Sequence, residues 1–330
     1  MGDGRNMWVN VLISAIILAG AIAVYFRIVR ALKMTDTPNP RSSHQLPTIR
    51  GGGIIFPIAL LLFIFFDSGQ WLLWTTGVFL AALVSFWDDW REVPAKWRLV
   101  VYFIAAALLI AEFDLWQQSV PYSLLLLILF TGIINAYNFM DGINGITGAY
   151  SLLWLLSIFV LHWHLDTGFP DLFFYIMSVS LVIFILLNFR KRALCFAGDV
   201  GSISIALILL FPTFWLIHTT GSWIFLLLLA VYGIDSVLTI FYRLIKGENI
   251  FRAHRHHIYQ NLANEWNWEH LPIALLYTGI QLLINILMLQ FLAASATAQI
   301  IFGATLLLLL SVSYYLLKRS TLSRFGSKNY

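Results

Sequence analysis

Residues Asn135–Gly148 read NAYNFMDGINGITG and lie between two long apolar runs, Tyr122–Ile134 and Ile146–His162. Apolar runs of this kind are typical of membrane segments, yet an Asp near the centre of a bilayer costs about 3 kcal/mol on insertion scales. The glycines of the stretch lower helix propensity and let the backbone approach a ligand closely. We therefore interpret the region around Asp141 as a helix end that opens into a polar loop at a membrane surface.

Three polar side chains of this stretch share one helical face, because Asn135, Asn138 and Asp141 are spaced i, i+3 and i+6. The Asp141 carboxylate can accept hydrogen bonds or ligate a metal, and the amides can bind a nucleobase or a sugar. Read alone, the pattern equally fits a polar turn in which Asn and Asp cap helices.

The composition indicates a polytopic helical membrane protein. Hydrophobic residues make up 60% of the 330 residues, charged residues make up 11%, and the mean hydropathy is +0.83. Soluble domains carry about 25% charge. The apolar runs are too long and continuous for a β-barrel, so helices are the expected spanning elements. The single cysteine, Cys195, excludes an internal disulfide.

Apolar runs recur along the whole chain, so we predict one transmembrane domain over residues 1–330, with eleven transmembrane helices. The first run is interpreted as a retained helix and not as a signal peptide. The odd number of helices places the two termini on opposite sides of the membrane. The runs cover residues 8–26, 52–66, 71–87, 98–111, 122–138, 146–162, 172–189, 202–217, 222–240, 271–292 and 298–317.

The basic residues predict the orientation. Every Lys and Arg except Arg5 falls in the loops after the first, third, seventh and ninth runs or in the C-terminal tail. Cytoplasmic loops carry such an excess, so the C-terminus is expected in the cytoplasm and the N-terminus outside. The loop around Asp141 is then cytoplasmic as well. The expected active-site loops are residues 30–53, 88–98, 139–146, 190–201 and 241–270.

Two adjacent acids, Asp88 and Asp89, end the third run. The helix dipole disfavours anions at a C-terminus, and neighbouring like charges repel. Either a metal ion or the basic residues Arg91, Lys96 and Arg98 must compensate them. An oxygen-ligated Mg²⁺ site with room for substrate phosphates fits this chemistry.

A second acidic motif, FAGDVGS at residues 196–202, precedes the eighth run. Asp199 stands between two glycines, which suits a metal ligand in a loop that a substrate approaches closely. Phe196 offers a ring on which a base could stack. The alternative interpretation is a helix-start turn capped by Asp199 or Ser202.

The basic loops favour phosphate as a ligand. Residues 251–257 read FRAHRHH, and arginine binds phosphate oxygens through paired hydrogen bonds. Zinc is the poorer choice because no cysteine is near and the spacing matches no common structural site. In the first loop, Arg41, His44 and Arg50 could also bind phosphate, although the bias towards basic cytoplasmic loops alone explains them. Asp235, one turn inside the ninth run, is expected to be functional or paired.

Acids, a hard cation and Arg/His side chains on one membrane face describe phosphoryl-transfer catalysis. The alternative is a non-catalytic transporter or lipid-binding membrane protein. A transporter typically places its ionisable residues near the bilayer midplane, often between two related halves. The acids here lie at the ends of apolar runs and the chain shows no internal repeat, so we favour the enzyme.

Four motifs together resemble the polyprenyl-phosphate N-acetylhexosamine-1-phosphate transferases, which belong to glycosyltransferase family 4 and include the phospho-MurNAc-pentapeptide translocase. The resemblance spans about residues 36–260, and the loop HQLPTIRGGG also resembles the family's first cytoplasmic loop. The motifs are DD at 88–89, NxxNxxDGINGI at 135–146, FAGDVGS at 196–202 and DSxxTxxxRxxxGxxxFxxxRxH at 235–257.

The resemblance implies that a polyprenyl phosphate oxygen attacks the β-phosphate of a UDP-N-acetylamino sugar, and that UMP leaves. It implies Mg²⁺, or Mn²⁺ in its place, bound by Asp199 with Asp141 and Asp88. It also implies that Phe196 contacts uracil. Asn138 and Asp141 would line the nucleotide and metal site, Asn144 stands where some members have Asp, and Asp88 and Asp89 would deprotonate or orient the lipid phosphate. Whether the reaction takes one displacement or forms a covalent aspartyl intermediate stays open.

The last loop departs from many members of the family, because HRHHIYQ replaces a longer histidine cluster. This form resembles the branch that starts O-antigen chains of lipopolysaccharide with UDP-GlcNAc, UDP-FucNAc or UDP-QuiNAc type donors. We expect His254, Arg255 and His257 to bind the diphosphate, and Tyr259 and Gln260 to face the sugar.

The expected location is the bacterial inner membrane. The expected partners are undecaprenyl phosphate, a UDP-sugar and membrane lipid, with no nucleic acid. The oligomeric state, a homodimer included, stays open.

Overall fold

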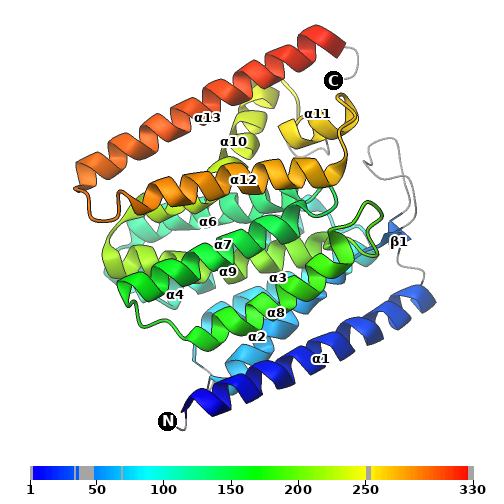
Figure 1. Cartoon of the computed structure of the whole chain (residues 1–330), viewed down its shortest axis with the longest axis vertical. Coiled ribbons are helices and arrows are strands. Elements are labelled where there is room, and N and C mark those ends of the chain that lie inside the picture. The colour runs from blue at the N-terminus through cyan, green and yellow to red at the C-terminus, as the bar shows by residue number, and fades with distance from the viewer. Residues whose placement is uncertain (1–2, 33–34, 37–47, 68–69, 250–253, 326–330) are drawn as a thin grey trace.

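The computed structural model describes residues 3–32, 35–36, 48–67, 70–249 and 254–325, which form a bundle of helices (Figure 1). Arg41, His44 and Arg252, for which the basic loops predict phosphate contacts, lie outside these residues. The α-helices are α1 (Asp3–Leu32), α2 (Ile55–Phe66), α3 (Leu72–Trp90), α4 (Ala95–Ala111), α5 (Leu115–Gln118), α6 (Val120–Met140), α7 (Ile146–Leu165), α8 (Asp171–Asn188), α9 (Gly198–Thr220), α10 (Ala230–Ile245), α11 (Ile258–Asn264), α12 (His270–Leu289) and α13 (Ala296–Phe325).

Each predicted apolar run lies in a helix, so the expected all-α polytopic fold is confirmed. The runs that form α2, α3 and α4 are shorter or less apolar than the others, and they pack into the same bundle. Within the described residues, eight helical spans are long and apolar enough to cross a membrane: 6–31, 120–140, 146–165, 171–188, 198–220, 223–245, 270–289 and 296–325.

Short elements complete the chain. Two 3₁₀-helices, η1 (Gly52–Ile54) and η2 (Trp223–Leu229), run directly into α2 and α10. The strands β1 (Thr35–Asp36) and β2 (Thr48–Ile49) form a two-residue antiparallel ladder, with Thr35 opposite Ile49. The ninth apolar run is therefore not one uniform α-helix, because its first part has the tighter 3₁₀ winding.

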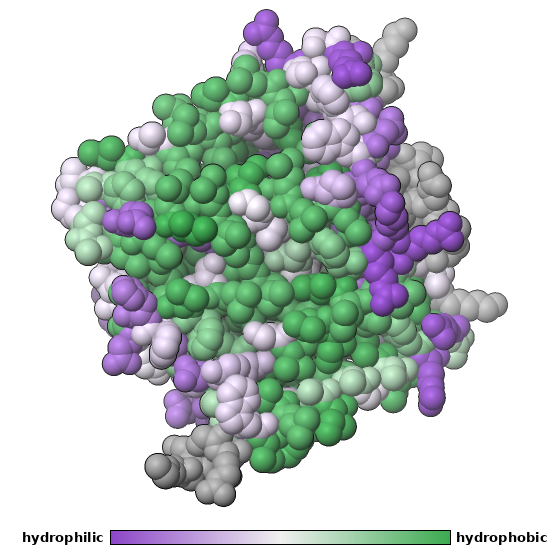
Figure 2. Space-filling model, viewed as in Figure 1, coloured by the Kyte–Doolittle hydropathy of each residue, from purple (hydrophilic) through white to green (hydrophobic). Residues whose placement is uncertain are grey.

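Successive long helices run in alternating directions, and the N- and C-termini lie at opposite ends of the bundle (Figure 1). We call the end that carries the C-terminus the charged end. There, α3, α6, α8, α10 and α13 end, and α2, α4, α7, α9 and α12 begin. Figure 2 shows an apolar band between the two ends, with hydrophilic residues gathered at each of them. This arrangement suits a bilayer around the middle of the bundle.

The helix α9 is the centre of the fold. In its most apolar stretch of 18 residues, 94% of the residues are buried, whereas in that of α13 only 6% are buried. A helix that is apolar on all sides belongs inside a protein, and α9 packs against α2, α3, α6 and α7. The first turn of α9 carries Asp199. The centre of the fold therefore presents its N-terminus at the charged end.

Candidate active site

A glycine-rich turn holds Arg50 beside the start of α9. Backbone bonds run from Gly52 N to Phe196 O (2.8 Å) and from Gly53 N to Ala197 O (3.0 Å). A Cβ on Gly53 would collide with the Gly201 backbone, so the two segments touch at a distance that only glycine permits. The predicted loops around residues 50 and 199 are thereby brought together.

Two arginines bridge the three aspartates of two motifs, DD and FAGDVGS. Arg98 Nη1 lies 2.7 Å from Asp88 Oδ2 and 2.8 Å from Asp199 Oδ2. Arg50 Nε lies 2.7 Å from Asp89 Oδ1, and its Nη2 lies 3.4 Å from Asp199 Oδ1. We call these five side chains the carboxylate–arginine cluster. The two arginines offset the repulsion between the three carboxylates. Arg98 is one of the basic residues for which this charge compensation was predicted.

The two adjacent aspartates differ in their surroundings. The Asp89 side chain is fully buried, and it accepts hydrogen bonds from Asp199 N (2.9 Å) and Val200 N (3.1 Å) in the first turn of α9. Asp88 accepts from Val93 N (2.6 Å), and its side chain is 9% exposed. Asp89 therefore neutralises a helix N-terminus, which is a structural task that its predicted catalytic role did not include.

The DGING turn places Asp141 and Asn138 next to α9. Asn138 Nδ2 donates to Ser202 Oγ (2.9 Å), and the Asp141 carboxylate accepts from the Thr147 hydroxyl. Burial raises the pKa of the Asp141 carboxyl to about 6, and the nearby charge of Asp199 acts in the same direction. A cation or a positively charged group beside Asp141 would offset that cost.

Asn144, predicted to bind substrate, ties two loops together. Its Nδ2 donates to the carbonyl oxygens of Arg190 (3.0 Å) and Lys191 (3.3 Å), and the residue is only 4% exposed. Its backbone N–H donates to His270 Nδ1 (3.3 Å). The structure thus gives Asn144 a role in the support of the DGING turn, and its predicted contact with substrate stays a prediction.

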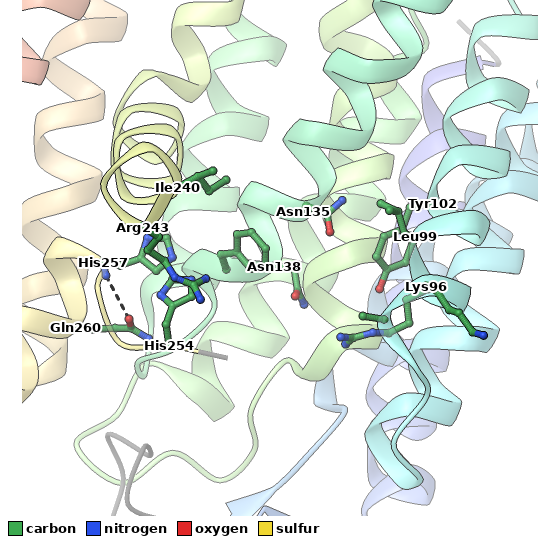
Figure 3. Close-up of a pocket in the computed structure, with 13 residues that line it drawn as sticks. Lys96, Leu99, Tyr102, Asn135, Asn138, Ile240, Arg243, His254, His257 and Gln260 are labelled. Atoms are coloured by element: carbon green, nitrogen blue, oxygen red, sulfur yellow. Dashed lines mark hydrogen bonds between the residues drawn. The ribbon is translucent and has the colours of Figure 1, made fainter. Parts of the chain in front are cut away.

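A cavity of about 780 Å³ opens beside the cluster, between α4, α6 and α10 (Figure 3). Its lining joins cationic and polar groups to apolar ones and, in the described residues, includes no carboxylate. Such a lining suits a ligand with an anionic head and an apolar tail. The residues are Ala95, Lys96, Arg98, Leu99, Tyr102, Asn135, Asn138, Phe139, Ile240, Arg243, His254, His257 and Gln260.

The last loop contributes part of what was predicted. His254, His257 and Gln260 line the cavity, and Arg255 is half-buried outside its lining. Tyr259 is 1% exposed and donates its hydroxyl to Phe139 O (2.9 Å). Tyr259 is therefore a buried anchor between α11 and α6, and the expectation that it faces the sugar is corrected.

Asp235 proves to be paired. It is 3% exposed and lies 3.2 Å from His257 Nδ1. Burial, with neighbouring cationic side chains, lowers the pKa of His254 to about 3, so His254 is neutral at pH 7. The positive charge at the cavity therefore comes chiefly from Lys96 and Arg98, because the buried Arg243 is paired with Glu248 at 3.1 Å.

The fit of a divalent cation depends on the oxygen donors of α9 and the DGING turn. The described residues contain no ready cluster of three or more His, Cys, Asp and Glu that could hold a metal ion. Asp199 and Asp141 nevertheless supply hard oxygen ligands, and Mg²⁺ often uses only one or two carboxylates together with substrate phosphates. Arg50 and Arg98, which contact the two oxygens of Asp199, are about one-third exposed. The oxygens of Asp199 and Asp141 fit Mg²⁺. Asp88 contacts Val93 N and Arg98 through its two oxygens, and its role as a third metal ligand stays a prediction.

Two residues that line the cavity, Arg243 and Lys96, were not predicted to belong to the site. Arg243 forms part of the fourth motif, and Lys96 was treated only as charge compensation. Both are basic residues within one helical turn of the boundary of an apolar run. The signal that could have identified them is a cation on the same helical face as Leu99 or Ile240.

The fold and the site define a helical membrane protein with carboxylates and cations gathered at one end of its bundle (Figure 2). Residues 71–217 match the model of glycosyl transferase family 4. The match covers slightly less than half of the chain, and it shows that the chain is similar to this family.

Named relatives agree with the family match. The phospho-N-acetylmuramoyl-pentapeptide-transferase of Thermotoga neapolitana is 28% identical over 72% of this chain and 83% of its own length. The undecaprenyl-phosphate alpha-N-acetylglucosaminyl 1-phosphate transferase of Escherichia coli O157:H7 is 24% identical over 71% of this chain and 70% of its own. A probable enzyme of the latter kind from Bacillus subtilis is 24% identical, over 72% and 71%.

Proposed function

We propose that this chain transfers an N-acetylamino-sugar 1-phosphate from a UDP-sugar to undecaprenyl phosphate, with release of UMP. The names of its relatives support this reaction and give no support to a transporter. The observation that carries the proposal is the meeting of two features at the charged end of the bundle. One is the carboxylate–arginine cluster at the start of α9, and the other is the adjoining cavity with its cationic and apolar lining.

The acceptor is assigned to the cavity. Lys96, Arg98 and Arg243 suit the terminal phosphate, and arginine in particular holds phosphate oxygens with two parallel hydrogen bonds. Leu99 and Ile240 give the first isoprene units an apolar wall. A lipid phosphate can enter from the bilayer, because the outer faces of α4 and α10 carry exposed apolar side chains such as Ile104 and Phe241.

The UDP-sugar is assigned to the start of α9. Phe196, which is partly exposed, would stack on uracil, and Asn138 would bind the nucleotide. Asp199 and Asp141 would hold Mg²⁺, which supplies charge neutralisation at the phosphates when it is bound. Arg98 links the two halves of the site because it contacts Asp199 and also lines the cavity.

The reaction joins the two substrates at this boundary. An oxygen of the acceptor phosphate attacks the β-phosphorus, the bond to the bridging oxygen of UMP breaks, and UMP leaves with the electron pair. Arg50 and Arg98 face the phosphates and stabilise negative charge that spreads over their oxygens.

The cellular setting is part of the proposal. We place the protein in the bacterial inner membrane with the charged end in the cytoplasm, because the basic loops gather at that end. The HRHHIYQ form of the last loop supports a role at the start of O-antigen or another lipopolysaccharide polymer.

The test is an assay of UMP release by the purified protein in detergent, with undecaprenyl phosphate, Mg²⁺ and a panel of UDP-GlcNAc, UDP-FucNAc and UDP-QuiNAc. We expect UMP release with at least one donor, dependence on the lipid phosphate and loss on addition of EDTA. Absence of UMP release with every donor, in protein that retains its thermal unfolding transition, would overturn the proposal.

A further inference from the structure

A buried carboxylate holds one histidine of the last loop in a fixed orientation. Asp235, on α10, accepts hydrogen bonds from Ile258 N (3.0 Å) and from the Tyr277 hydroxyl (2.6 Å) on α12. Its Oδ1 also lies 3.2 Å from His257 Nδ1. Three elements of the bundle therefore converge on one carboxylate, and that carboxylate orients the His257 ring.

These contacts decide which ring nitrogen carries the proton. Asp235 is surrounded by donors, so it serves as an acceptor, and His257 Nδ1 must hold the hydrogen between them. The other nitrogen, Nε2, is then the acceptor of the neutral ring. Because the two nitrogens project in different directions from the ring, Nε2 points away from Asp235 when Nδ1 faces it.

Nε2 is the unusual atom of this arrangement. His257 is 1% exposed, and its Nε2 is buried without a hydrogen-bond partner among the residues that the structure describes. A buried polar atom left unpaired costs about 1–3 kcal/mol. His257 also lines the cavity, beside Arg243 and Gln260 (Figure 3). The cost is recovered if a ligand in the cavity supplies a hydrogen to Nε2.

We propose that His257 Nε2 takes the remaining proton of the acceptor phosphate, and that Asp235 is the positioning residue that prepares Nε2 for it. This inference rests on the proposed function. The O–H bond of the monoprotonated phosphate breaks, the oxygen keeps the electron pair and an Nε2–H bond forms. The phosphate thus becomes a dianion paired with an imidazolium, and Asp235 balances the imidazolium charge.

The chemistry of a phosphate monoester suits this transfer. The second pKa of a phosphate monoester is about 6, so part of the acceptor still carries a proton near neutral pH. The dianion is the better nucleophile, and a shared proton keeps it bound. The ring of His254 lies 5.0 Å from that of His257 and must turn aside for the phosphate to reach Nε2.

Several other titratable or charged groups surround His257 and must be separated from it in any pH experiment. Arg98 and Lys96 face it across the cavity from α4. The groups packed nearer are Asp235 and Arg243 on α10, Tyr259 on α11, Tyr277 on α12, Lys318 on α13, and His254 and His256 of its own loop. Comparison of the variants with the parent protein at each pH separates the effect of His257 on the rate from the effects of these groups.

The experiment measures kcat, and kcat/KM for undecaprenyl phosphate, from the release of UMP at saturating donor sugar, from pH 6 to pH 9.5. In the parent protein we expect kcat/KM for undecaprenyl phosphate to fall at alkaline pH, because loss of the shared proton weakens binding of the phosphate. His257→Gln should lower kcat about 100-fold near neutral pH, within the usual range for a general base, and should abolish the alkaline fall. Asp235→Asn should move the midpoint of that fall about one pH unit lower, because it removes an opposite charge at hydrogen-bond distance.

The matched control is His162→Gln. His162 is also a buried histidine near an aspartate, with its Nε2 3.4 Å from Asp171, but it lies at the opposite end of α7. This variant should keep both the rate and the alkaline fall. Tyr277→Phe, which removes one donor to Asp235 and keeps its charge, should shift the midpoint less than Asp235→Asn does.

Two results would overturn the inference while leaving the proposed function intact. One is an alkaline fall in His257→Gln at the same pH as in the parent. The other is a midpoint that Asp235→Asn leaves unchanged while its thermal unfolding transition is retained. If the parent protein itself releases no UMP, the proposed function has failed instead.

Discussion

The Asp89 carboxylate binds the backbone N–H of Asp199, at 2.9 Å, and so joins the C-terminal turn of α3 to the N-terminal turn of α9. Asp89 thus anchors α9, the buried helix that carries the site. The neighbouring Asp88 instead contacts Val93 N and Arg98. The adjacent acids can be separated by experiment.

Asp89→Asn should destabilise the protein, because the amide group would place a donor against the N–H groups of Asp199 and Val200 and would remove the ionic contact with Arg50. Because the Arg50 side chain is 35% exposed, the cost should lie below the range of about 3–5 kcal/mol that is typical when a fully buried pair loses one charge. We expect a fall in the thermal unfolding temperature well beyond that of Asp88→Asn. Equal unfolding temperatures for the two variants would contradict the division of tasks.

Asp199→Asn keeps the shape of the side chain and removes its charge. We expect UMP release to fall by orders of magnitude at saturating Mg²⁺, because the carboxylate is the assigned ligand for a charge-neutralising ion. Asp114→Asn, an exposed acid at the far end of the bundle, is the control and should retain activity. Near-normal turnover in Asp199→Asn would exclude Asp199 as the metal ligand.

Phe196→Ala tests the nucleotide side of the site. Stacking of a base on an aromatic ring contributes about 1–3 kcal/mol, so UMP should bind roughly 5- to 150-fold more weakly, measured by calorimetry. Phe196→Trp should be milder, and Phe65→Ala, at a ring that is 78% exposed on the outer surface, should have no effect. Unchanged affinity in Phe196→Ala would place uracil elsewhere.

Gln260 and Tyr259 should separate in a specificity assay. Gln260 lines the cavity where the acceptor phosphate must meet the sugar-bearing β-phosphate of the donor, so Gln260→Ala should change the ratios of kcat/KM among UDP-sugars. Tyr259→Phe removes only a buried hydrogen bond to Phe139 O, so it should cost about 1 kcal/mol of stability and leave the ratios unchanged. Shifted ratios in Tyr259→Phe would restore the original expectation that Tyr259 faces the sugar.

The neutral state of His254 predicts a pH dependence of stability. Its pKa in the folded protein, about 3, lies below the ordinary value of 6.5, so protons bind preferentially to the unfolded chain. This contribution is fully present above pH 6.5 and is lost as the pH falls towards 3. The unfolding temperature should drop between pH 7 and pH 5, and His254→Gln should reduce that drop. An identical drop in the variant would contradict the assignment.

Most of the fold could be predicted from the sequence because long apolar runs interrupted by basic loops leave few alternatives to a helical bundle. The site loops could be placed at one end for the same reason. The helix α1 extends well beyond its apolar run, since hydropathy marks the membrane boundary and not the last hydrogen bond.

What the sequence could not reveal are the contacts between distant segments. The sequence alone does not distinguish Asp88 from Asp89. Their side chains leave the last turn of α3 in different directions, and this decides that α9 covers Asp89. Asn144 looked like a ligand for substrate because nothing in its own segment shows the carbonyl groups of Arg190 and Lys191. The pairing of Asp235 with His257 likewise depends on a loop that folds back over α10.

The central position of α9 also has a consequence for the order in which the molecule is made. Among the described residues, the helices that pack most closely against α9 are α2, α3, α4, α6 and α7, all of which precede it in the chain, and η2 follows it. Arg50, Asp89 and Arg98 are therefore synthesised before Asp199, which they contact in the finished fold. All side chains of the carboxylate–arginine cluster thus leave the ribosome before α10 to α13. The wall of the cavity that carries Arg243 and His257 is synthesised last.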